Sequence, residues 1–414
     1  MPNQPNSSGS TPPHPPPRPA PTVAPSNTPP HRAAPVPPAQ PPLPHHLPSN
    51  SCGTPDFERY GIDDEGGGYL WHTTDERFRA DLNPNEPNRF GWVVEVNPWL
   101  PGSMPIKRTS LGRMKHEGAV VTTSPSGQTV VYMGDDERFE YVYKFVSAGG
   151  WRDLLAEGRS PLDEGTLYVA RYDDDGTGEW LPLIWGEGPL TPENAFADQG
   201  DVLIRTRAAA DALGATPMDR PEWATVHPTR EIFMTFTNNT EREEPDAANP
   251  RVENAYGHIL RWVEADRDVG ATSFTWEVFI LAGAGTGTGD GSSIEADDAF
   301  GSPDGLWADP DGRIWIQTDG TQPIPCNNQM LGADPWTDEV RRFLVGVPGC
   351  EVTGVTTTGD RRTMFLNIQH PGTEGTPEDP TAESGWPDHD PAGASPLRDR
   401  DHPQGRRRRD RHLS

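Results

Sequence analysis

The feature that most constrains this chain is a series of short, strand-like segments between residues 56 and 372, separated by turn residues. The segments are rich in Val, Ile, Tyr, Phe and Trp, which favour β-strands. Several connections contain Asp-Gly pairs, such as Asp311 with Gly312, which favour tight turns between antiparallel strands. The pattern predicts an all-β domain whose strands include 91–96, 129–133, 141–146, 166–172, 232–236, 257–263, 274–281, 313–317, 351–356 and 363–368.

Three architectures suit many short strands of this kind: a β-propeller, a sandwich or two stacked barrels. We favour the propeller because residues 302–306, followed by 313–320, are typical of the inner hairpin of one blade. Blades of about 40 to 45 residues would give about six or seven of them, and we expect about six. A short helical insertion is expected at 202–213, capped by Asp201 and ended by Gly214.

The two ends of the chain differ in composition from the predicted propeller. The first 50 residues contain 19 of the 48 prolines and no aromatic or acidic residue, so we expect residues 1–55 to be disordered. This segment lacks the apolar centre of a signal peptide. From residue 373 the apolar alternation is lost and the chain ends near four consecutive arginines, 406–409, so 373–414 is expected to be a disordered tail. The predicted domain is therefore 56–372.

The charge balance limits the classes of partner. With 62 acidic and 35 basic residues the formal net charge is −27, which argues against nucleic acid and against an anionic membrane. The sequence also has no apolar run long enough to span a bilayer. An anionic substrate would need a local reversal of this charge, and cations held by clustered carboxylates would supply it. The three cysteines have no zinc-like spacing, although Cys326 and Cys350 could form one disulfide.

Around Pro221 the sequence contains a candidate site for an anion and a cation. Proline fixes its own φ and favours extended geometry in the residue before it, so Arg220 and Glu222 are expected to project to the same side. An arginine there suits an anion and a glutamate suits a cation. The alternative is a purely structural ion pair between the two side chains.

Further carboxylates stand at the predicted ends of strands. Glu117 precedes Gly118, which would allow a close backbone approach, and Glu351 begins a predicted strand. Asp135 and Asp136 are adjacent, so in extended geometry one is expected to face the propeller axis and the other the solvent. Calcium takes six to eight oxygen ligands, and carboxylates from several blades would supply them. For each residue alone, the alternative is a role in a turn or a helix cap.

Taken together, several motifs resemble the PhoX family of bacterial alkaline phosphatases. They occur in the same order as in that family, over some three hundred residues of this chain. The matching blocks are 111–119, 131–136, 140–147, 219–223, 237–239, 249–251, 257–259, 302–306 and 367–372.

This resemblance implies a monomeric β-propeller, periplasmic or secreted, that hydrolyses small-molecule phosphate esters at a cluster of calcium and iron ions. Carried over by motif, Glu117, Glu222 and Asp136 correspond to metal ligands, and Arg220 corresponds to the residue that holds the phosphoryl oxygens. Asp135 and Glu351 are metal-ligand candidates from the residues alone. Two other classes remain open: a calcium-dependent propeller hydrolase such as a lactonase, and a non-enzymatic propeller scaffold.

The chain departs from the family pattern in one segment. The family has a Thr-Cys-Glu-Glu-Asn segment whose cysteine resembles an iron ligand, and this chain has no equivalent, because Cys52 is followed by Gly, Thr and Pro. Family-like sequence extends from about residue 58 to 388. We therefore expect a truncated or frame-shifted reading of a longer gene, with an open propeller edge and impaired activity.

Overall fold

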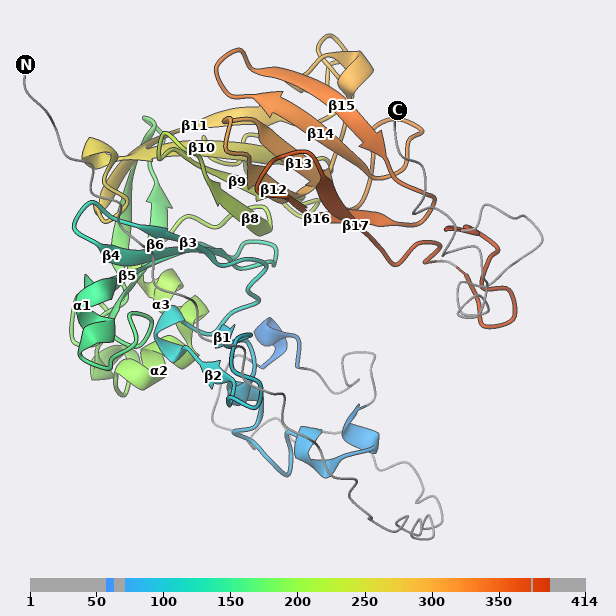
Figure 1. Ribbon diagram of the computed structural model, residues 1–414. Helices are drawn as coiled ribbons and strands as arrows, with labels where there is room; N and C mark the ends of the chain where they lie inside the picture. The colour runs from blue at the N-terminus through green and yellow to red at the C-terminus, as the bar shows by residue number, and fades with distance from the viewer. Residues whose placement is uncertain (1–56, 63–70, 374, 388–414) are drawn as a thin grey trace, which may run out of the picture. The chain divides into compact units, whose positions relative to one another are not determined.

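The computed structural model describes residues 57–62, 71–373 and 375–387, all within one compact unit, His46–Ser414 (Figure 1). The predicted disordered segment 1–55, with Cys52, and most of the predicted tail lie outside the described residues. The described part is mainly β-structure, as predicted. Its α-helices are α1 (Trp151–Ala156), α2 (Gln199–Ile204) and α3 (Thr206–Leu213). No helix in the described part is both long and apolar enough to cross a membrane.

Nine antiparallel strands form the largest sheet, in the order β3-β4-β5-β6-β7-β11-β10-β9-β8. The sheet curls, because its last strand, β8, also contacts β3 and β4 at the opposite end. The strands are β3 (Val120–Thr123), β4 (Gln128–Gly134), β5 (Val142–Gly150), β6 (Gly165–Tyr172), β7 (Thr177–Pro182), β8 (Pro221–Val226), β9 (Ile232–Phe236), β10 (His258–Glu264) and β11 (Ser273–Leu281).

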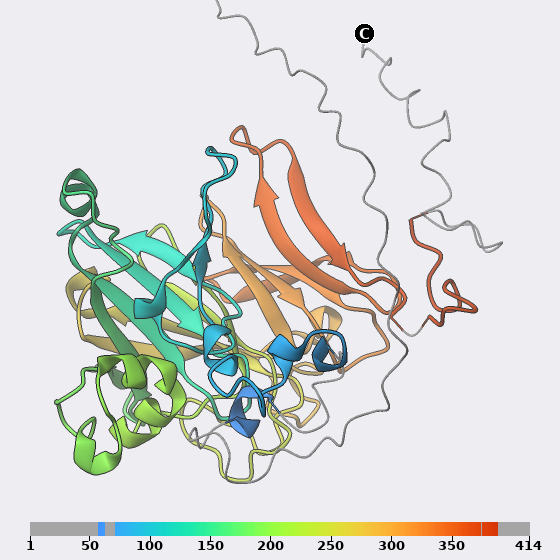
Figure 2. The same cartoon turned by 90° about the horizontal axis from the view of Figure 1, so that it is seen from below.

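A four-stranded antiparallel sheet follows, made of β12 (Pro303–Ala308), β13 (Ile314–Thr318), β14 (Gln329–Asp334) and β15 (Glu339–Val345). Its first strand contacts β8 and β9, so the two sheets share a core. The pair β16 (Glu351–Thr357) and β17 (Met364–Gln369) lies beside this sheet, as Figure 2 shows in red-orange. A second pair, β1 (Val94–Glu95) and β2 (Ile106–Lys107), precedes the large sheet.

The predicted hairpin of β12 and β13 is confirmed. Among the described residues, only β12–β15 form a separate four-stranded sheet, so the expected number of about six blades remains a prediction.

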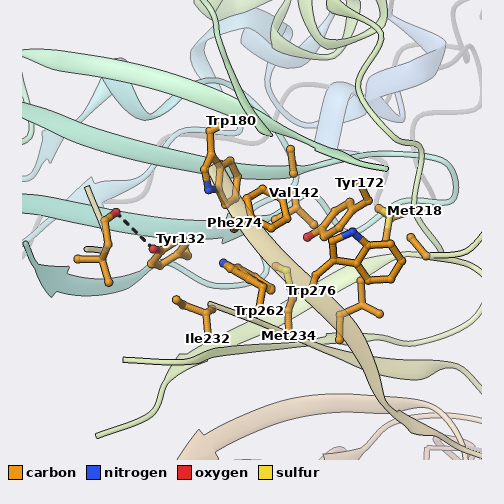
Figure 3. Packing of buried hydrophobic residues seen from close by; sticks show 14 of the residues in the cluster. Tyr132, Val142, Tyr172, Trp180, Met218, Ile232, Met234, Trp262, Phe274 and Trp276 are labelled. Atoms are coloured by element: carbon orange, nitrogen blue, oxygen red, sulfur yellow. Dashed lines mark hydrogen bonds between the residues drawn. The ribbon is translucent and has the colours of Figure 1, made fainter. Parts of the chain in front are cut away.

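Aromatic side chains fill the interior of the nine-stranded sheet (Figure 3). The ring centroids of Tyr132 and Trp262 are 5.9 Å apart, and those of Trp180 and Phe274 are 5.2 Å apart. Tyr132 donates a hydrogen bond of 2.6 Å to Glu264, which lies in the same core. Buried aromatic pairs of this kind contribute free energy beyond their buried area, so this cluster anchors the sheet that carries the site.

The predicted helix at 202–213 is in fact two helices that meet at Arg205. The N-cap is Asp198, whose side chain accepts a hydrogen bond of 2.8 Å from the backbone N–H of Asp201. Asp201 lies in the first turn of α2, so its predicted role as the cap was wrong. The predicted end is confirmed, since Gly214 adopts φ +73° after α3, a conformation that glycine accepts readily.

Candidate metal centre

Three of the predicted site residues, Glu117, Asp136 and Glu222, form one group of carboxylates. Each offers an oxygen atom, and these three atoms lie within 4.8 Å of one another. They come from different segments: Asp136 follows β4, Glu222 lies on β8, and Glu117 follows an isolated bridge between His116 and Asp135. We call these three residues the acidic group.

The acidic group exists because the end of β4 lies very close to β8. A Cβ atom placed on Gly134 would lie 2.4 Å from the carbonyl oxygen of Glu222 and 2.6 Å from that of Pro221. Only glycine permits this approach of two backbones. This close approach places Asp136, two residues after Gly134, in front of Glu222.

Arg220 borders the acidic group on one side. Its Nε donates to Asp136 Oδ1 at 2.8 Å, and its Nη2 donates to Glu222 Oε1 at 2.9 Å. The prediction that Arg220 and Glu222 face one space is therefore confirmed, but the predicted backbone geometry is wrong. Arg220 has φ +58°, in the left-handed region, and its carbonyl oxygen accepts a hydrogen bond of 3.1 Å from Thr237 N–H. Tertiary contacts override the extended preference of a residue before proline.

Asp135 is directed away from the acidic group. Its carboxylate is fully buried and pairs with Arg207 on α3, at 2.5 Å and 2.8 Å. It also accepts a hydrogen bond of 3.0 Å from the backbone N–H of Lys115. The two adjacent aspartates do alternate, but Asp135 faces the protein interior instead of solvent. The structure thus gives Asp135 an internal ion pair, not a place among the clustered ligand atoms.

Glu351 belongs to a second group, with Asp319 and His370. One ligand atom from each lies within 4.8 Å of the others. Asp319 follows β13, Glu351 begins β16 and His370 follows β17. His370 Nε2 lies 3.5 Å from Glu351 Oε2, and Gln369 Nε2 donates to the same oxygen at 2.5 Å. We call Asp319, Glu351 and His370 the mixed group, since it combines carboxylates with an imidazole.

Asp304, on β12, faces residues of both groups and was missed by the sequence interpretation. It is buried, and its Oδ1 has no hydrogen-bond partner among the described residues. Burial, followed by the negative charges of Glu351 and Glu117, raises the pKa of Asp304 to about 8. The available signal was the block 302–306, which the sequence interpretation read as a hairpin and a family motif without giving its aspartate a role.

The carboxylates repel one another in both groups. Burial, with the charges of Asp136 and Glu351, raises the pKa of Glu117 to about 7. Burial also raises the pKa of Glu222 well above its usual range, with the charges of Asp304 and Asp136 adding to the effect. Carboxylates held this close are costly unless cations compensate their charge. The donor set therefore fits multivalent cations, and its oxygens match the ligands of a hard ion such as calcium.

A pocket of about 350 Å³ opens beside the mixed group. Asp319 and His370 line it, together with Cys326 and Cys350. Both cysteines are free thiols, so the disulfide that the sequence allowed does not form. Cys350 is buried in a small apolar cluster with Met330 and Val352.

Comparisons with known proteins identify the family of the chain. A family model described as alkaline phosphatase PhoX matches residues 48–372. The structure is similar to that of Pseudomonas fluorescens PhoX in complex with vanadate, a transition-state analogue, with a TM-score of 0.77 and 43% sequence identity. A gluconolactonase from Xanthomonas campestris matches with a TM-score of 0.25 and 13% identity, over 63% of this chain and 66% of that one. No curated protein sequence matches the chain.

The match to the Pseudomonas fluorescens protein covers 84% of this chain and 63% of that chain, so the chain spans less than two thirds of its relative's length. This similarity supports the predicted β-propeller class. Composition and strand pattern alone were also compatible with a sandwich or two stacked barrels. The family model covers more than three quarters of the 414 residues. The chain therefore belongs to the PhoX family of alkaline phosphatases.

Proposed function

We propose that this chain hydrolyses phosphate esters at a cation cluster, with Arg220 holding the phosphoryl oxygens. The observation that carries the proposal is the contact of Arg220 with Asp136 and Glu222 at the border of the acidic group. The negative charge of the clustered carboxylates would repel a phosphate, and a guanidinium beside them offers the phosphate a bidentate donor. The solved relative is described as a complex with vanadate, a transition-state analogue, which supports a phosphoryl-transfer site in this family.

The two groups differ in the ions that suit them. The acidic group offers only carboxylate oxygens, which calcium prefers, so Glu117, Asp136 and Glu222 would hold calcium. The mixed group adds the imidazole of His370, which suits a transition metal such as iron. When bound, such ions would offset the charge of the ester and of the carboxylates.

The residues of the chain have separate tasks in this proposal. Arg220 orients the ester and stabilises the negative charge that develops on the phosphoryl oxygens in the transition state. Its side chain is about 28% exposed, so one side of the guanidinium is open to solvent while Asp136 and Glu222 restrain the other. Asp304, between the groups, would contribute oxygen to either cation position.

A phosphatase assay on p-nitrophenyl phosphate tests the proposal. Activity is expected with added calcium and is expected to disappear on chelation, and metal analysis of the purified chain would report whether iron accompanies calcium. Activity that survives chelation, or that occurs only with lactones, would contradict the proposal. Arg159→Ala provides a control variant that should behave as the unmodified chain. Arg159 is exposed, pairs with Glu164 and belongs to neither group.

A further inference from the structure

Thr237 follows β9 and lies beneath the acidic group. Its side chain is about 1% exposed, and its hydroxyl oxygen lies 2.8 Å from Glu222 Oε1. The same hydroxyl lies 3.1 Å from the carbonyl oxygen of Pro303, the residue before Asp304. Its backbone N–H donates to the carbonyl oxygen of Arg220 at 3.1 Å. One residue thus contacts both members of the Arg220 and Glu222 pair and the strand that carries Asp304.

The hydroxyl has a single proton, which it can give to one of its two neighbours. Oε1 of Glu222 is the nearer acceptor, at 2.8 Å against 3.1 Å for the carbonyl oxygen of Pro303. A bound cation would keep Glu222 ionised, and a hydrogen bond to an ionised group is about twice as strong as one between neutral groups. Oε1 of Glu222 also accepts from Arg220, so two donors from different segments converge on one oxygen. These bonds fix the rotamer of Glu222 relative to Asp136 and Glu117.

The backbone of Thr237 is itself held in place by close packing. A Cβ atom on Gly257 would lie 2.2 Å from the carbonyl oxygen of Phe236 and 2.3 Å from that of Thr237. Gly257 has φ +73° and donates its N–H to Asn254 Oδ1 at 3.0 Å. The segment after β9 therefore rests on a backbone contact that no other residue type allows, and its position is defined before any ligand binds.

We propose that Thr237 is a positioning residue for the cation site: its hydroxyl holds Glu222 toward the other carboxylates, and its N–H holds Arg220 in its left-handed conformation. This inference rests on the proposed function, because it assumes that Glu222 binds a cation. Partners that orient a metal ligand typically change metal affinity by about 10- to 100-fold when they are removed. The hydroxyl of Thr237 is expected to act in that range.

Calorimetric titration of the chelator-treated full chain with calcium chloride alone tests this role. Thr237→Val keeps the shape and loses the hydroxyl, and should bind calcium about 10- to 100-fold more weakly. Thr237→Ser keeps the hydroxyl and should bind within about threefold of the unmodified chain, a change well below that range. Thr225→Val is the matched control, since Thr225 of β8 is also buried, and its hydroxyl accepts a hydrogen bond of 2.9 Å from the backbone N–H of Ala308 on β12 instead of contacting the acidic group.

The outcomes separate the inference from the proposed function. Equal calcium affinity of Thr237→Val and the unmodified chain would overturn the positioning role, as would a Ser variant as weak as the Val variant. Absence of calcium binding by the unmodified chain would overturn the proposed cation site and the inference together. If the Val variant does not fold, Thr237→Ala against Thr237→Ser isolates the same hydroxyl, and thermal unfolding of each variant verifies that it is folded.

Discussion

Asp135 and Asp136 are adjacent in the chain, yet each pairs with a different arginine on a different side of β4. Asp135 pairs with Arg207 of α3 in the interior, whereas Asp136 pairs with Arg220 at the acidic group. The first pair anchors the end of the strand, and the second presents a carboxylate to the proposed site. Alternation along an extended backbone thus directs two adjacent aspartates to different partners over a single residue.

Replacement of Arg220 by Ala should lower kcat on p-nitrophenyl phosphate by on the order of a hundredfold or more, because it removes charge stabilisation in the transition state. Arg220→Lys keeps the charge but loses the bidentate donor, and should recover only part of the rate. Steady-state kinetics of both variants, with Arg159→Ala as the surface control, provide the measurement. Unchanged kinetics in Arg220→Ala would mean that the arginine is purely structural.

Asp135→Asn should destabilise the fold by about 3 to 5 kcal/mol, because the buried guanidinium of Arg207 loses its nearest charged partner and is left with Glu140, whose Oε1 lies 3.5 Å from Nε. Both side chains of this pair are fully buried. Glu241→Gln disrupts the exposed pair between Arg138 and Glu241 and should cost at most about 1 kcal/mol. Denaturant unfolding measures the loss of unfolding free energy in each of the two variants. Equal losses would contradict the expected difference between the buried and the exposed ion pair.

The stability of the fold should depend on His258 below neutral pH. Burial lowers the pKa of this imidazole from 6.5 to about 4. The positive charges of Arg251 and Arg242 lower the pKa further, while the negative charge of Asp219 partly opposes the shift. The unfolded chain binds the proton more tightly than the folded chain does. The contribution of His258 to the free energy of unfolding is therefore fully present above pH 6.5 and is lost as the pH falls toward 4, by about 3 kcal/mol in total.

The matching variant is His258→Gln, which removes the titrating group. The difference in unfolding free energy between the unmodified chain and this variant should shrink as the pH falls from 7 to 4.5. Chemical denaturation at several pH values measures this difference. A difference that stays constant over the range would show that His258 does not titrate as its environment dictates.

Asp304→Asn should have opposite effects with and without cations. Without cations, folding must either protonate Asp304, whose pKa is raised to about 8, or bury its charge beside Glu117 and Glu351. Asn removes this cost, so the melting temperature should rise in the presence of a chelator. With calcium the variant should gain less stability than the unmodified chain, because ligand binding stabilises a fold according to its affinity. Thermal unfolding with chelator and with calcium measures both, and a larger calcium shift in the variant would contradict Asp304 as a ligand.

The sequence predicted the fold class and named Arg220, Glu222 and Asp136 as candidate site residues, but it did not predict the distant contacts that position them. The contact between Arg220 and Glu222 followed from their spacing and from family motifs, although the predicted backbone of Arg220 was wrong, because a distant N–H from Thr237 sets it. The position of Asp304 near both groups was missed, because the sheet arrangement brings it close to Glu117 and Glu351. The ion pair of Asp135 was not predicted, because its partner, Arg207, lies 72 residues away in the sequence, on a helix. The spacing of residues predicts in which direction neighbouring side chains point, whereas contacts between residues far apart in the sequence can be known only from the fold.

The strand order of the nine-stranded sheet also determines when the site can form. Asp136 follows β4, near one end of the sheet, while Glu222 lies on β8 at the other end, and the strands between them span residues 142 to 281. Contacts between residues far apart in sequence form slowly, because loop closure must precede them. The acidic group is therefore expected to form late in folding, so the proposed calcium binding should report complete closure of the sheet instead of the formation of its individual hairpins.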